Sequence, residues 1–420
     1  MNATQHTDTQ LRVRLAHPTG NANVRQVLQM LQAHNHLDAF YTSIAWSKDS
    51  WLNQCLPASI TSQLKRRHFD VPHTAQKTNP WKELGRLVAS QLNATAFTQN
   101  GRGIFSVDQV YRSLDRRVSR ELTDATPHAV YCYEDSALHT FRKARDLGVA
   151  RIYDLPIAYW SESRRLLEEE VERLPQWAAT MPGILDSEKK LARKTEEAEL
   201  ADTIICPSEF VRKSLPESIL KNTNCVVAPF GCASGSELSA RQTPKEGPLR
   251  VLFVGSMTQR KGLSDIFEAM KLLNRSDIQL VVLGALNDSL DFYRSEYADF
   301  IYEAPRPHSG VLELMSECDA FILPSLVEGR ALVQLEALGV GLPLIITHNT
   351  GGDDLVQEDG RTGFFVPIRS PEAIAEKLNW FAENRDQIDA MKFACRQRAS
   401  QIQWSEYQSS VYKAIIETIR

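Results

Sequence analysis

From Leu249 onward, short apolar runs alternate with segments in which apolar residues recur at helical spacing. Runs such as LRVLFVG and IQLVVLG are short and continuous, as buried strands are, whereas LSDIFEAMKLL has the period of a helix. The alternation continues through DAFILPS, the helical ALVQLEALGVG and LPLIITH. Strands that alternate with helices form a parallel sheet with helices on both faces. The C-terminal half is therefore predicted to be a doubly wound α/β domain.

The N-terminal half repeats this style in the runs LRVRLAHP, HAVYCYE, ARIYDLP, DTIICPS and CVVAPFG. A chain of 420 residues is too long for one ordinary domain and suits two of about 150–200 residues. We expect an N-terminal Rossmann-like domain over residues 1–240 and a second over residues 249–400, joined by the polar stretch 234–248. A terminal helix over residues 401–420 is expected to pack back on the first domain. Ligands should bind in the cleft between the carboxyl ends of the two sheets.

Composition argues against several classes of function. The formal net charge of −4 gives no global sign of a nucleic-acid partner. No apolar run approaches the roughly 20 residues of a membrane-spanning helix, and the polar first ten residues lack a signal segment. The seven cysteines are scattered without C-x-x-C spacing, so we interpret them as reduced thiols rather than metal ligands. These features favour a cytoplasmic protein.

The densest motif is PSLVEGRALVQLEALGVGLP, which begins at Pro324. Glu328 lies in the loop after a predicted strand, and Glu336 lies eight residues later in the following helix. At about 1.5 Å of rise per residue the two carboxylates are roughly 10 Å apart along the axis, about the span from the hexose of a nucleotide sugar to its ribose. Glu336 can then bind ribose hydroxyls and Glu328 a sugar hydroxyl. Between them the helix N-terminus presents phosphate-binding amides, which are those of Gly329, Arg330, Ala331 and Leu332.

This motif resembles the E-x7-E signature of retaining GT-B glycosyltransferases, the family 4-like group known as glycosyl transferases group 1. Upstream, VLFVGSMTQRKG matches the family's glycine loop ending in Lys-Gly, and PHSGVLELMSECDAFILPS matches the helix and strand before the motif. Downstream, THNTGGDDLVQEDGRTGFFVP matches its Gly-Gly turn and its Asp-Gly-x-x-Gly-Phe ending. The resemblance covers about residues 195–400 strongly and the N-terminal third weakly. It implies the GT-B fold, with two doubly wound Rossmann-like domains facing a cleft.

The resemblance also implies cations for the donor diphosphate. Gly255 ends the first strand of the C-terminal domain, and Lys261 precedes a glycine at a helix start, where its ammonium can neutralise phosphate. The family usually has an arginine directly after the strand's glycine, but this chain has Ser256, which makes Arg260 the candidate for the second cation. Family members place the nucleobase against backbone near FIYEAP, so Ala304 to Arg306 is the candidate base pocket.

The N-terminal domain supplies weaker candidates. The family places the loop corresponding to HPTGNANVRQ over the donor phosphates and sugar, here through Gly20 and Asn21, although a simple strand-to-helix turn is the alternative. Where the family often has a histidine near the donor anomeric carbon, this chain has Asp154. Its carboxylate either stabilises charge on the sugar or orients the acceptor hydroxyl, or it caps a turn without a catalytic role. Glu134 and Asp135 are secondary candidates for acceptor contacts.

These features predict an enzyme that transfers a sugar, with retention, from a nucleotide diphosphate-sugar to a hydroxyl of a glycan, lipid or small molecule. Lys261, Glu328 and Asp154 are the catalytic candidates, and Lys261 and the helix amides would stabilise the departing diphosphate. Because the chain has no Asp-x-Asp triplet, we expect no metal and no cofactor besides the co-substrate. The alternatives are a nucleotide-sugar epimerase and a non-catalytic nucleotide-sugar-binding protein on the same fold.

The segment Trp51–Phe69, WLNQCLPASITSQLKRRHF, is basic and aromatic. Such a helix can lie on an anionic bilayer with its apolar side inward, which would hold the protein peripherally at the inner membrane face. The alternative, which we favour for this segment, is an ordinary surface helix near the acceptor cleft.

Overall fold

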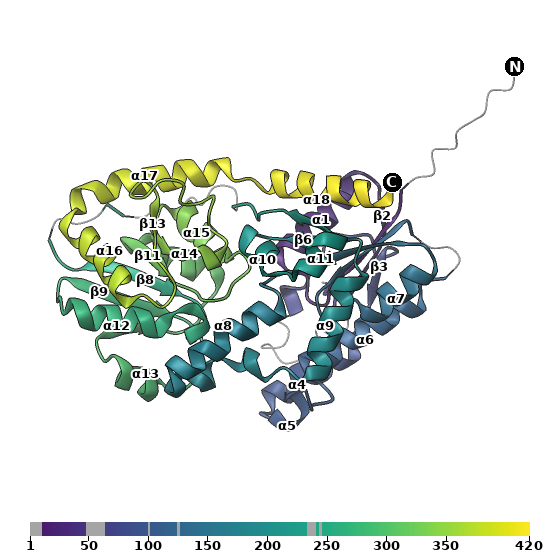
Figure 1. Cartoon of the computed structure of the whole chain (residues 1–420), viewed down its shortest axis with the longest axis horizontal. Coiled ribbons are helices and arrows are strands. Elements are labelled where there is room, and N and C mark those ends of the chain that lie inside the picture. The colour runs from purple at the N-terminus through teal and green to yellow at the C-terminus, as the bar shows by residue number, and fades with distance from the viewer. Residues whose placement is uncertain (1–10, 48–63, 100, 124–126, 233–240, 243–245) are drawn as a thin grey trace, which may run out of the picture.

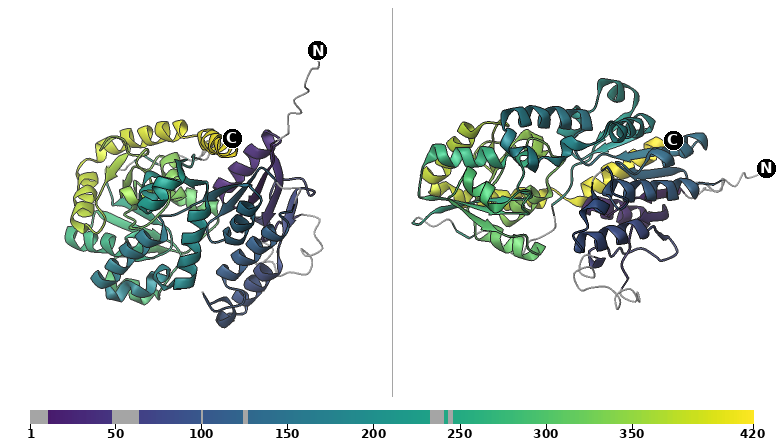
Figure 2. Two further views of the ribbon diagram at one scale, coloured as in Figure 1. Left: turned by 45° about the vertical axis from the view of Figure 1, so that its right-hand side comes forward. Right: turned by 90° about the horizontal axis from the view of Figure 1, so that it is seen from below.

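Two parallel sheets, each covered by helices on both faces, lie side by side in the computed structural model of the chain (Figures 1 and 2). The model describes residues 11–47, 64–99, 101–123, 127–232, 241–242 and 246–420. The predicted α/β architecture of two doubly wound units is confirmed in these residues.

The first sheet contains seven parallel strands in the order β3-β2-β1-β4-β5-β6-β7. Their bounds are β1 (Val13–Ala16), β2 (Leu37–Thr42), β3 (Gln76–Thr78), β4 (Ala129–Tyr133), β5 (Ala150–Asp154), β6 (Thr203–Cys206) and β7 (Asn224–Val227). Every residue of β1 and β6 is buried, because helices cover both faces, and this is why these strands read as continuous apolar runs. Strands β2 and β3 escape prediction because Asp38 and the polar run QKT interrupt that pattern.

The second sheet contains six parallel strands in the order β10-β9-β8-β11-β12-β13. Their bounds are β8 (Leu249–Val254), β9 (Ile278–Leu283), β10 (Phe300–Glu303), β11 (Ala320–Leu323), β12 (Leu344–Ile346) and β13 (Gly363–Phe365). The strand order changes direction between β8 and β11 here, and between β1 and β4 in the first sheet. Ligands bind beyond the carboxyl ends of strands at such switch points. The loops that follow β1, β8 and β11 carry most of the predicted site residues, whereas Asp154 ends β5, Ala304 and Arg306 follow β10, and Leu332 and Glu336 lie in the helix Leu332–Val340.

The helices of the N-terminal domain are α1 (Ala22–Ala33), α4 (Trp81–Gln91), α5 (Thr95–Thr98), α6 (Val107–Arg120), α7 (Leu138–Asp146), α9 (Glu188–Leu200), α10 (Glu209–Ser214) and α11 (Glu217–Asn222). Those of the C-terminal domain are η3 (Gln259–Lys261), α12 (Leu263–Leu273), α13 (Leu290–Glu296), α14 (His308–Ser316), α15 (Leu332–Val340), η4 (His348–Thr350), α16 (Pro371–Glu383) and α17 (Arg385–Gln401).

The last helix, α18 (Trp404–Ile419), runs from the C-terminal domain back over the N-terminal one (Figure 1). It packs against α1 and against strands β5, β6 and β7. The side-chain amide of Gln408 donates a hydrogen bond of 2.8 Å to Gln26 on α1. The end of the chain is therefore held on the first domain by both packing and polar contacts.

A second crossing, here called the strap, runs in the other direction. The strap is residues 160–185 and comprises α8 (Trp160–Arg173), η1 (Pro175–Thr180) and η2 (Pro182–Leu185). Trp177 is fully buried among aromatic side chains of the C-terminal domain. These are Phe267, Phe292 and Tyr293. The Trp177 indole N–H also donates to the Glu296 carboxylate at 2.9 Å. The strap thus follows β5 of the first sheet in sequence but packs in the core of the second domain.

Two expected features fall on residues that the structure does not describe. The first is most of the predicted linker, at positions 234–240 and 243–245. The second is residues 51–63 of the basic aromatic segment. In the described part of the chain, no helix is both long enough and apolar enough to cross a bilayer.

The strap can be tested with two tryptophans that differ in burial. We expect Trp177→Ala to lower the free energy of unfolding by about 3–5 kcal/mol, because it leaves a cavity among the C-terminal aromatics. Trp81→Ala is the matched control, since Trp81 is 79% exposed and its loss should cost no more than about 0.5 kcal/mol. Urea denaturation followed by circular dichroism measures both. Equal stabilities of the two variants would contradict the packing of the strap.

Candidate active site

The loops that follow the central strands β8 and β11 meet at the carboxyl ends of the strands of the second sheet. Gly262, between η3 and α12, has φ +75°, and a Cβ there would lie 2.2 Å from the carbonyl oxygen of Pro324. The Leu326 amide donates to the Arg260 carbonyl at 2.8 Å. Only glycine permits such an approach in this left-handed conformation. The Lys-Gly pair noticed in the sequence therefore sets how closely the cationic loop lies against the E-x7-E loop.

Two cations converge on the first glutamate of the motif. Oε1 of Glu328 lies 2.7 Å from Lys261 Nζ and 3.0 Å from an Nη atom of Arg260. Burial alone would raise the pKa of Glu328, but Lys261 and Arg260 hold it below its usual value, so the carboxylate is ionised. Gly255 makes room for the lysine, since a Cβ there would lie 2.9 Å from its side chain. The structure thus brings together Gly255, Arg260, Lys261 and Glu328.

The N-terminus of α15 differs in detail from the expected amide cradle. The helix begins at Leu332, and the Ala331 amide already donates to the Thr350 carbonyl at 3.2 Å, so Ala331 offers no unpaired amide. The Arg330 guanidinium is buried and turned into the C-terminal domain, where two of its N–H groups contact Asp354 at 2.5 and 2.8 Å. The Arg330 side chain therefore has a structural role, which is to bind Asp354 inside the C-terminal domain. The amides that the first turn leaves for a ligand are therefore those of Leu332 and Val333, because the Gln334 amide donates to the Ala331 carbonyl at 3.1 Å.

Glu336 lies on α15 and faces the start of α14. Its Oε1 is 3.0 Å from Nε2 of the exposed His308, and burial raises the pKa of Glu336 while His308 opposes the shift. The predicted base pocket, Ala304 to Arg306, immediately precedes α14, and Arg306 forms an ion pair with Glu303 there. The second glutamate and the candidate base loop are therefore neighbours, as a ribose next to a nucleobase requires.

The N-terminal domain touches the motif directly. A Cβ on Gly329 would lie 1.8 Å from the carbonyl oxygen of Pro156, in the loop after β5. Ser208, the N-cap of α10, donates from its hydroxyl to the Gly329 carbonyl at 2.7 Å. The Ala158 amide lies 3.4 Å from the Glu328 carbonyl. The carboxyl ends of the two sheets thus meet at the E-x7-E loop, where the cleft was expected.

The strap contacts the loop that carries Arg260 and Lys261 through a buried polar network. Gln259, which precedes Arg260 and Lys261, donates from its side chain to Glu170 at 2.6 Å and to Asp265 at 2.9 Å. Its backbone amide donates to the Thr180 hydroxyl at 3.1 Å. Glu170 is fully buried and also accepts from the guanidinium groups of the strap's Arg173 and of the C-terminal domain's Arg369. Buried polar groups are stable when each has partners, so this network fixes the loop.

The glycine loop after β1 is held by a buried histidine. Burial lowers the pKa of His17 to about 3, so the ring is neutral, and its Nδ1 accepts from the amides of Thr19 at 3.2 Å and Gly20 at 2.8 Å. Gly20 has φ +74°, and a Cβ there would lie 2.2 Å from the Phe69 ring. Asn21 is exposed at the start of α1. Close packing against Phe69 therefore explains why residue 20 is a glycine, and Asn21 remains accessible.

Asp154 lies at the end of β5 but points into the N-terminal domain. Its side chain accepts from the Asn23 amide at 3.0 Å, and the residue is 2% exposed. Burial raises the pKa of Asp154 to about 7, with Asn23 opposing and the Glu134 carboxylate adding to the shift. A group that reacts with substrate must be reachable. Its position favours the non-catalytic alternative, in which Asp154 holds Asn23 on the first turn of α1.

Glu134 and Asp135 follow β4 and belong to a cluster of alternating charges. Glu134 pairs with Lys194 of α9 at 3.2 Å. Asp135 has φ +68° and lies 2.7 Å from Arg193, which also contacts Asp108. An aspartate in this sparsely populated conformation is a strained position that the surrounding ion pairs stabilise. The end of β4 is therefore strongly charged, and ion pairs hold the side chains of both candidate residues.

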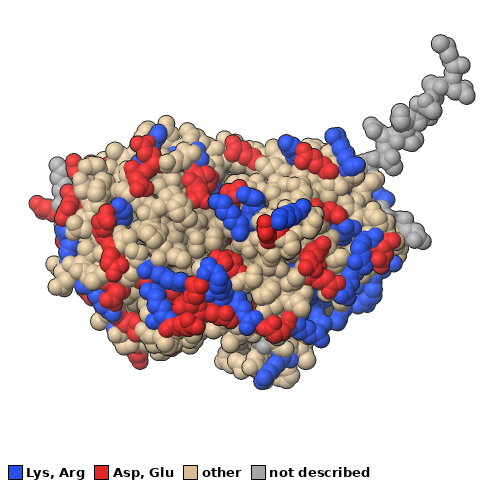
Figure 3. All heavy atoms as spheres, in the orientation of Figure 1, with Lys and Arg blue, Asp and Glu red and all other residues tan. Residues whose placement is uncertain are grey.

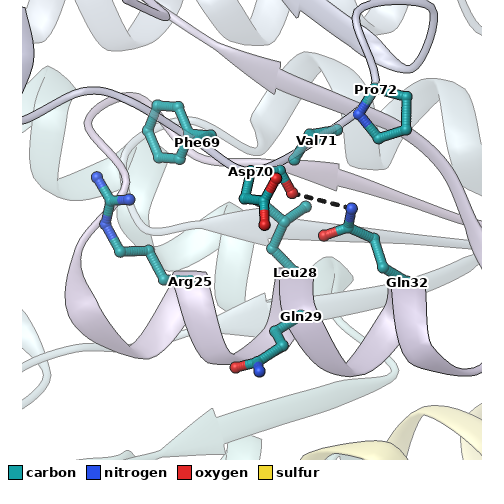
Figure 4. Close-up of a pocket in the computed structure, with 8 residues that line it drawn as sticks. All are labelled: Arg25, Leu28, Gln29, Gln32, Phe69, Asp70, Val71 and Pro72. Atoms are coloured by element: carbon teal, nitrogen blue, oxygen red, sulfur yellow. Dashed lines mark hydrogen bonds between the residues drawn. The ribbon is translucent and has the colours of Figure 1, made fainter.

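Two cavities of the molecule differ in their position relative to the candidate site residues. A cavity of about 140 Å³ lies between the strap and the motif, with Trp160, Lys194, Arg260 and Val327 among its lining residues. A larger hollow of about 760 Å³ follows α1 on its outer side (Figure 4), where the Gln32 side chain donates to the Asp70 carbonyl. Of these two, the first is the one lined by Arg260 and by Val327, which precedes Glu328. Within the described residues, no three His, Cys, Asp or Glu side chains gather as metal ligands would.

The sequence did not reveal the residues that hold other site residues in place. His308 is the first residue of α14, and nothing in the sequence signals its contact with Glu336, which joins positions 28 apart. Glu170 lies in a charged run, RRLLEEEVER, in which nothing distinguishes the buried glutamate from its exposed neighbours except helical phase. Ser208 was detectable as a helix N-cap, and the structure gives it the additional contact with Gly329.

Comparison with known proteins finds similarity in sequence and in structure. The family model described as Glycosyl transferases group 1 matches residues 235–398. The putative colanic acid biosynthesis glycosyltransferase WcaL of Salmonella typhimurium is 27% identical over 168 residues, which are 37% of this chain and 41% of that protein. The similarity thus spans less than half of either protein and lies well short of this relative's full length.

Two solved structures match nearly the whole chain. Sucrose-phosphate synthase from Thermosynechococcus elongatus superposes with a TM-score of 0.66 at 15% identity, over 97% of this chain and 98% of that one. Anabaena HepE in complex with UDP and glucose gives a TM-score of 0.58 at 12% identity, over 96% and 99%. At these identities the similarity concerns the fold, and it confirms the predicted pair of domains facing a cleft.

The environment of Asp154 predicts a pH dependence of stability. Its carboxyl has a pKa of about 7 in the folded state against 3.8 as its reference value, so the folded state binds the extra proton between these pH values. Raising the pH through this window therefore favours unfolding. We expect the stability of the wild type, measured relative to Asp154→Asn by urea denaturation, to fall between pH 4 and pH 7. A difference that stays constant over this range would contradict the assignment.

Proposed function

We infer that this chain, whose residues 235–398 belong to the glycosyl transferases group 1 family and whose two domains adopt the GT-B fold, is a retaining glycosyltransferase. It transfers a sugar from a nucleotide diphosphate-sugar to an acceptor hydroxyl. The observation that carries this proposal is the convergence of Arg260 and Lys261 on Glu328 beside the N-terminus of α15.

The charges of this cluster suit a diphosphate. Two cations and one carboxylate leave a net charge of +1 in a partly buried loop. A donor diphosphate carries more negative charge than Glu328 alone. Its oxygens can also accept hydrogen bonds from the amides at the start of α15. It therefore displaces Glu328 from part of its contact with the cations. The released carboxylate is then placed to accept a hydrogen bond from a hydroxyl of the donor sugar.

Catalysis follows from stabilisation of the leaving group. As the bond between the sugar and the phosphate breaks, negative charge grows on the nucleoside diphosphate and positive charge grows on the sugar. Lys261, Arg260 and the helix amides are fixed before the reaction by Glu328 and by the strap, so they stabilise the leaving group without reorganising. The acceptor hydroxyl attacks from the face that the leaving group vacates, which gives retention of configuration.

The donor in this proposal is a UDP-sugar. The complex of HepE contains UDP and glucose, and its fold superposes on this chain over nearly its whole length. In this chain the ribose contacts Glu336, the base contacts the loop Ala304 to Arg306, and His308 holds the Glu336 carboxylate in place. Asn21 contributes from the N-terminal loop, where it is exposed beside Gly20.

Replacement of the central lysine tests the enzyme class. We expect Lys261→Ala to lower kcat for release of the nucleoside diphosphate by about 10²–10³-fold, because one preorganised donor to the leaving group is lost. The matched control is Lys271→Ala, since this lysine of the same domain lies on the surface and pairs with Glu268. Coupled detection of UDP measures both rates. A Lys261→Ala enzyme with wild-type turnover would refute the mechanism, and tight donor binding without turnover in the wild type would favour the non-catalytic alternative.

Donor binding tests the role of the second glutamate. Among UDP-, GDP- and ADP-sugars we expect a UDP-sugar to give the largest rise in Tm, because a ligand that binds only the folded state stabilises it. Glu336→Ala should weaken that binding about 10–100-fold through loss of hydrogen bonds to a charged acceptor. Glu313→Ala, on the adjacent α14, serves as the control. Undiminished UDP-sugar affinity of Glu336→Ala in calorimetry would remove this residue from the site.

A further inference from the structure

A groove lies on the outer side of α1, away from Glu328 and its cations (Figure 4). Here called the α1 groove, it has a volume of about 760 Å³, within the range of about 300–1,000 Å³ that is usual for ligand sites. Helix α1 contributes Arg25, Leu28, Gln29 and Gln32, which recur every three or four residues and so lie on one face of the helix. The opposite wall is the segment 69–72. The proposed reaction uses none of these residues, so it leaves the groove without a role.

The α1 groove has an apolar floor and a polar rim. Leu28 is buried in the floor, and Val71 of the facing segment packs against the same apolar core. Gln29 and Asp70, in contrast, are exposed at the rim. A sugar ring has an apolar face of C–H groups and a polar edge of hydroxyl groups. The floor can therefore pack against the face of a sugar ring while the rim binds its hydroxyl groups.

Amide side chains line the helix side of the rim. The Gln32 amide donates to the Asp70 carbonyl at 3.0 Å and so joins the two walls of the groove (Figure 4). Gln408 of α18 donates to the Gln26 side chain at 2.8 Å, and its nitrogen lies 3.4 Å from the side-chain oxygen of Gln29. An amide group offers both donors and an acceptor, and each hydroxyl of a sugar needs both. A row of amides is therefore suited to neighbouring hydroxyl groups on one sugar ring.

The charges of the groove favour an uncharged ligand. Its lining residues carry one positive charge, on Arg25, and one negative charge, on Asp70. The Arg25 guanidinium lies over the Phe69 ring and donates to the backbone carbonyls of Arg66 at 2.7 Å and His68 at 2.6 Å, so it holds the wall together. Figure 3 shows Lys and Arg side chains gathered elsewhere on this domain, over α6 and α7. A phosphate or carboxylate group would therefore meet a cation that the chain itself already binds.

One end of the α1 groove lies next to the glycine loop after β1. Phe69 lines the groove, and it fills the space beside Gly20, where a Cβ would lie 2.2 Å from its ring. Arg25 follows Asn21 by four residues, which is about 6 Å along the axis of α1. Asn21 is exposed and contacts the donor in the proposed mechanism. An extended ligand that leaves the groove at its Arg25 end therefore points toward the glycine loop.

We propose that the α1 groove is a second glycan-binding site, which holds an uncharged oligosaccharide that forms the body of the acceptor while the end of this glycan is extended in the cleft. The proposal deepens the proposed function and rests on it for the role of the glycan as acceptor. Sugar rings lie over Leu28 and Val71, and their hydroxyl groups bind Gln29, Gln32 and Asp70. A glycan held at two places stays at a high local concentration near the reacting groups between transfers.

A glycan array probed with the full chain tests the second site. We expect the wild type to bind uncharged oligosaccharides of three or more sugar units in preference to monosaccharides and to glycans that carry carboxylate or phosphate groups. In calorimetry with the best-bound oligosaccharide, Gln29→Ala combined with Asp70→Ala should weaken binding about 10-fold or more, because hydrogen bonds to sugar hydroxyls are lost. The matched control is Asp386→Ala combined with Gln387→Ala, since these residues are of the same types and are exposed on α17 of the C-terminal domain.

Hydrogen exchange of the wild type locates the bound glycan, because it should slow the exchange of amides in residues 25–32 and 69–72. Three outcomes would overturn the proposal: no binding to any uncharged oligosaccharide of the array, equal affinities of the groove variant and the wild type, and slowed exchange that is confined to the loops of the cleft. Release of UDP by the wild type is measured separately. Glycan binding in the groove without any release of UDP would refute the proposed function and leave the second site standing, whereas release of UDP without such binding would do the reverse.

Discussion

One carboxylate holds two adjacent cations at the place where the two sheets meet. Arg260 and Lys261 repel each other, and partly buried cations are stable only beside a counter-charge. Glu328 supplies that charge from the neighbouring loop, at 3.0 and 2.7 Å. The same contact ties the loop after β8 to the loop after β11. The geometry of the proposed diphosphate site is therefore set by contacts within the chain.

The precision of this cluster depends on residues that come from the other half of the chain. Gln259 precedes the two cations, and its amide groups are held by Glu170 and Thr180 of the strap. Because the strap is anchored in the C-terminal core by Trp177, it is fixed to the same domain as the two cations. The chain crosses between the domains near Pro156, which contacts Gly329.

The sequence predicts the sheets and the motif loops well because these features are local. Buried parallel strands read as apolar runs, and a glycine next to a lysine at a helix start is visible in VLFVGSMTQRKG. The strap is not predictable in this way, because a helix of alternating charges does not reveal that Glu170 alone is buried against Arg369, 199 positions away. The orientation of Arg330 is likewise set by a distant partner, Asp354, and not by the motif in which it lies. Predictions failed where a side chain had two possible directions and tertiary contacts chose between them.

The two departures from the family pattern can be understood together. Ser256 removes a cation directly after the strand, and Arg260 provides one four residues later through its contact with Glu328. Asp154 stands where a histidine near the sugar is usual, but its carboxyl is buried beside Asn23, and burial raises its pKa to about 7. In the arrangement described here, it cannot act on a developing positive charge. In the proposed mechanism, catalysis therefore draws mainly on stabilisation of the departing diphosphate. Contacts from both halves of the chain fix the short turn of Arg260 and Lys261 that would provide it.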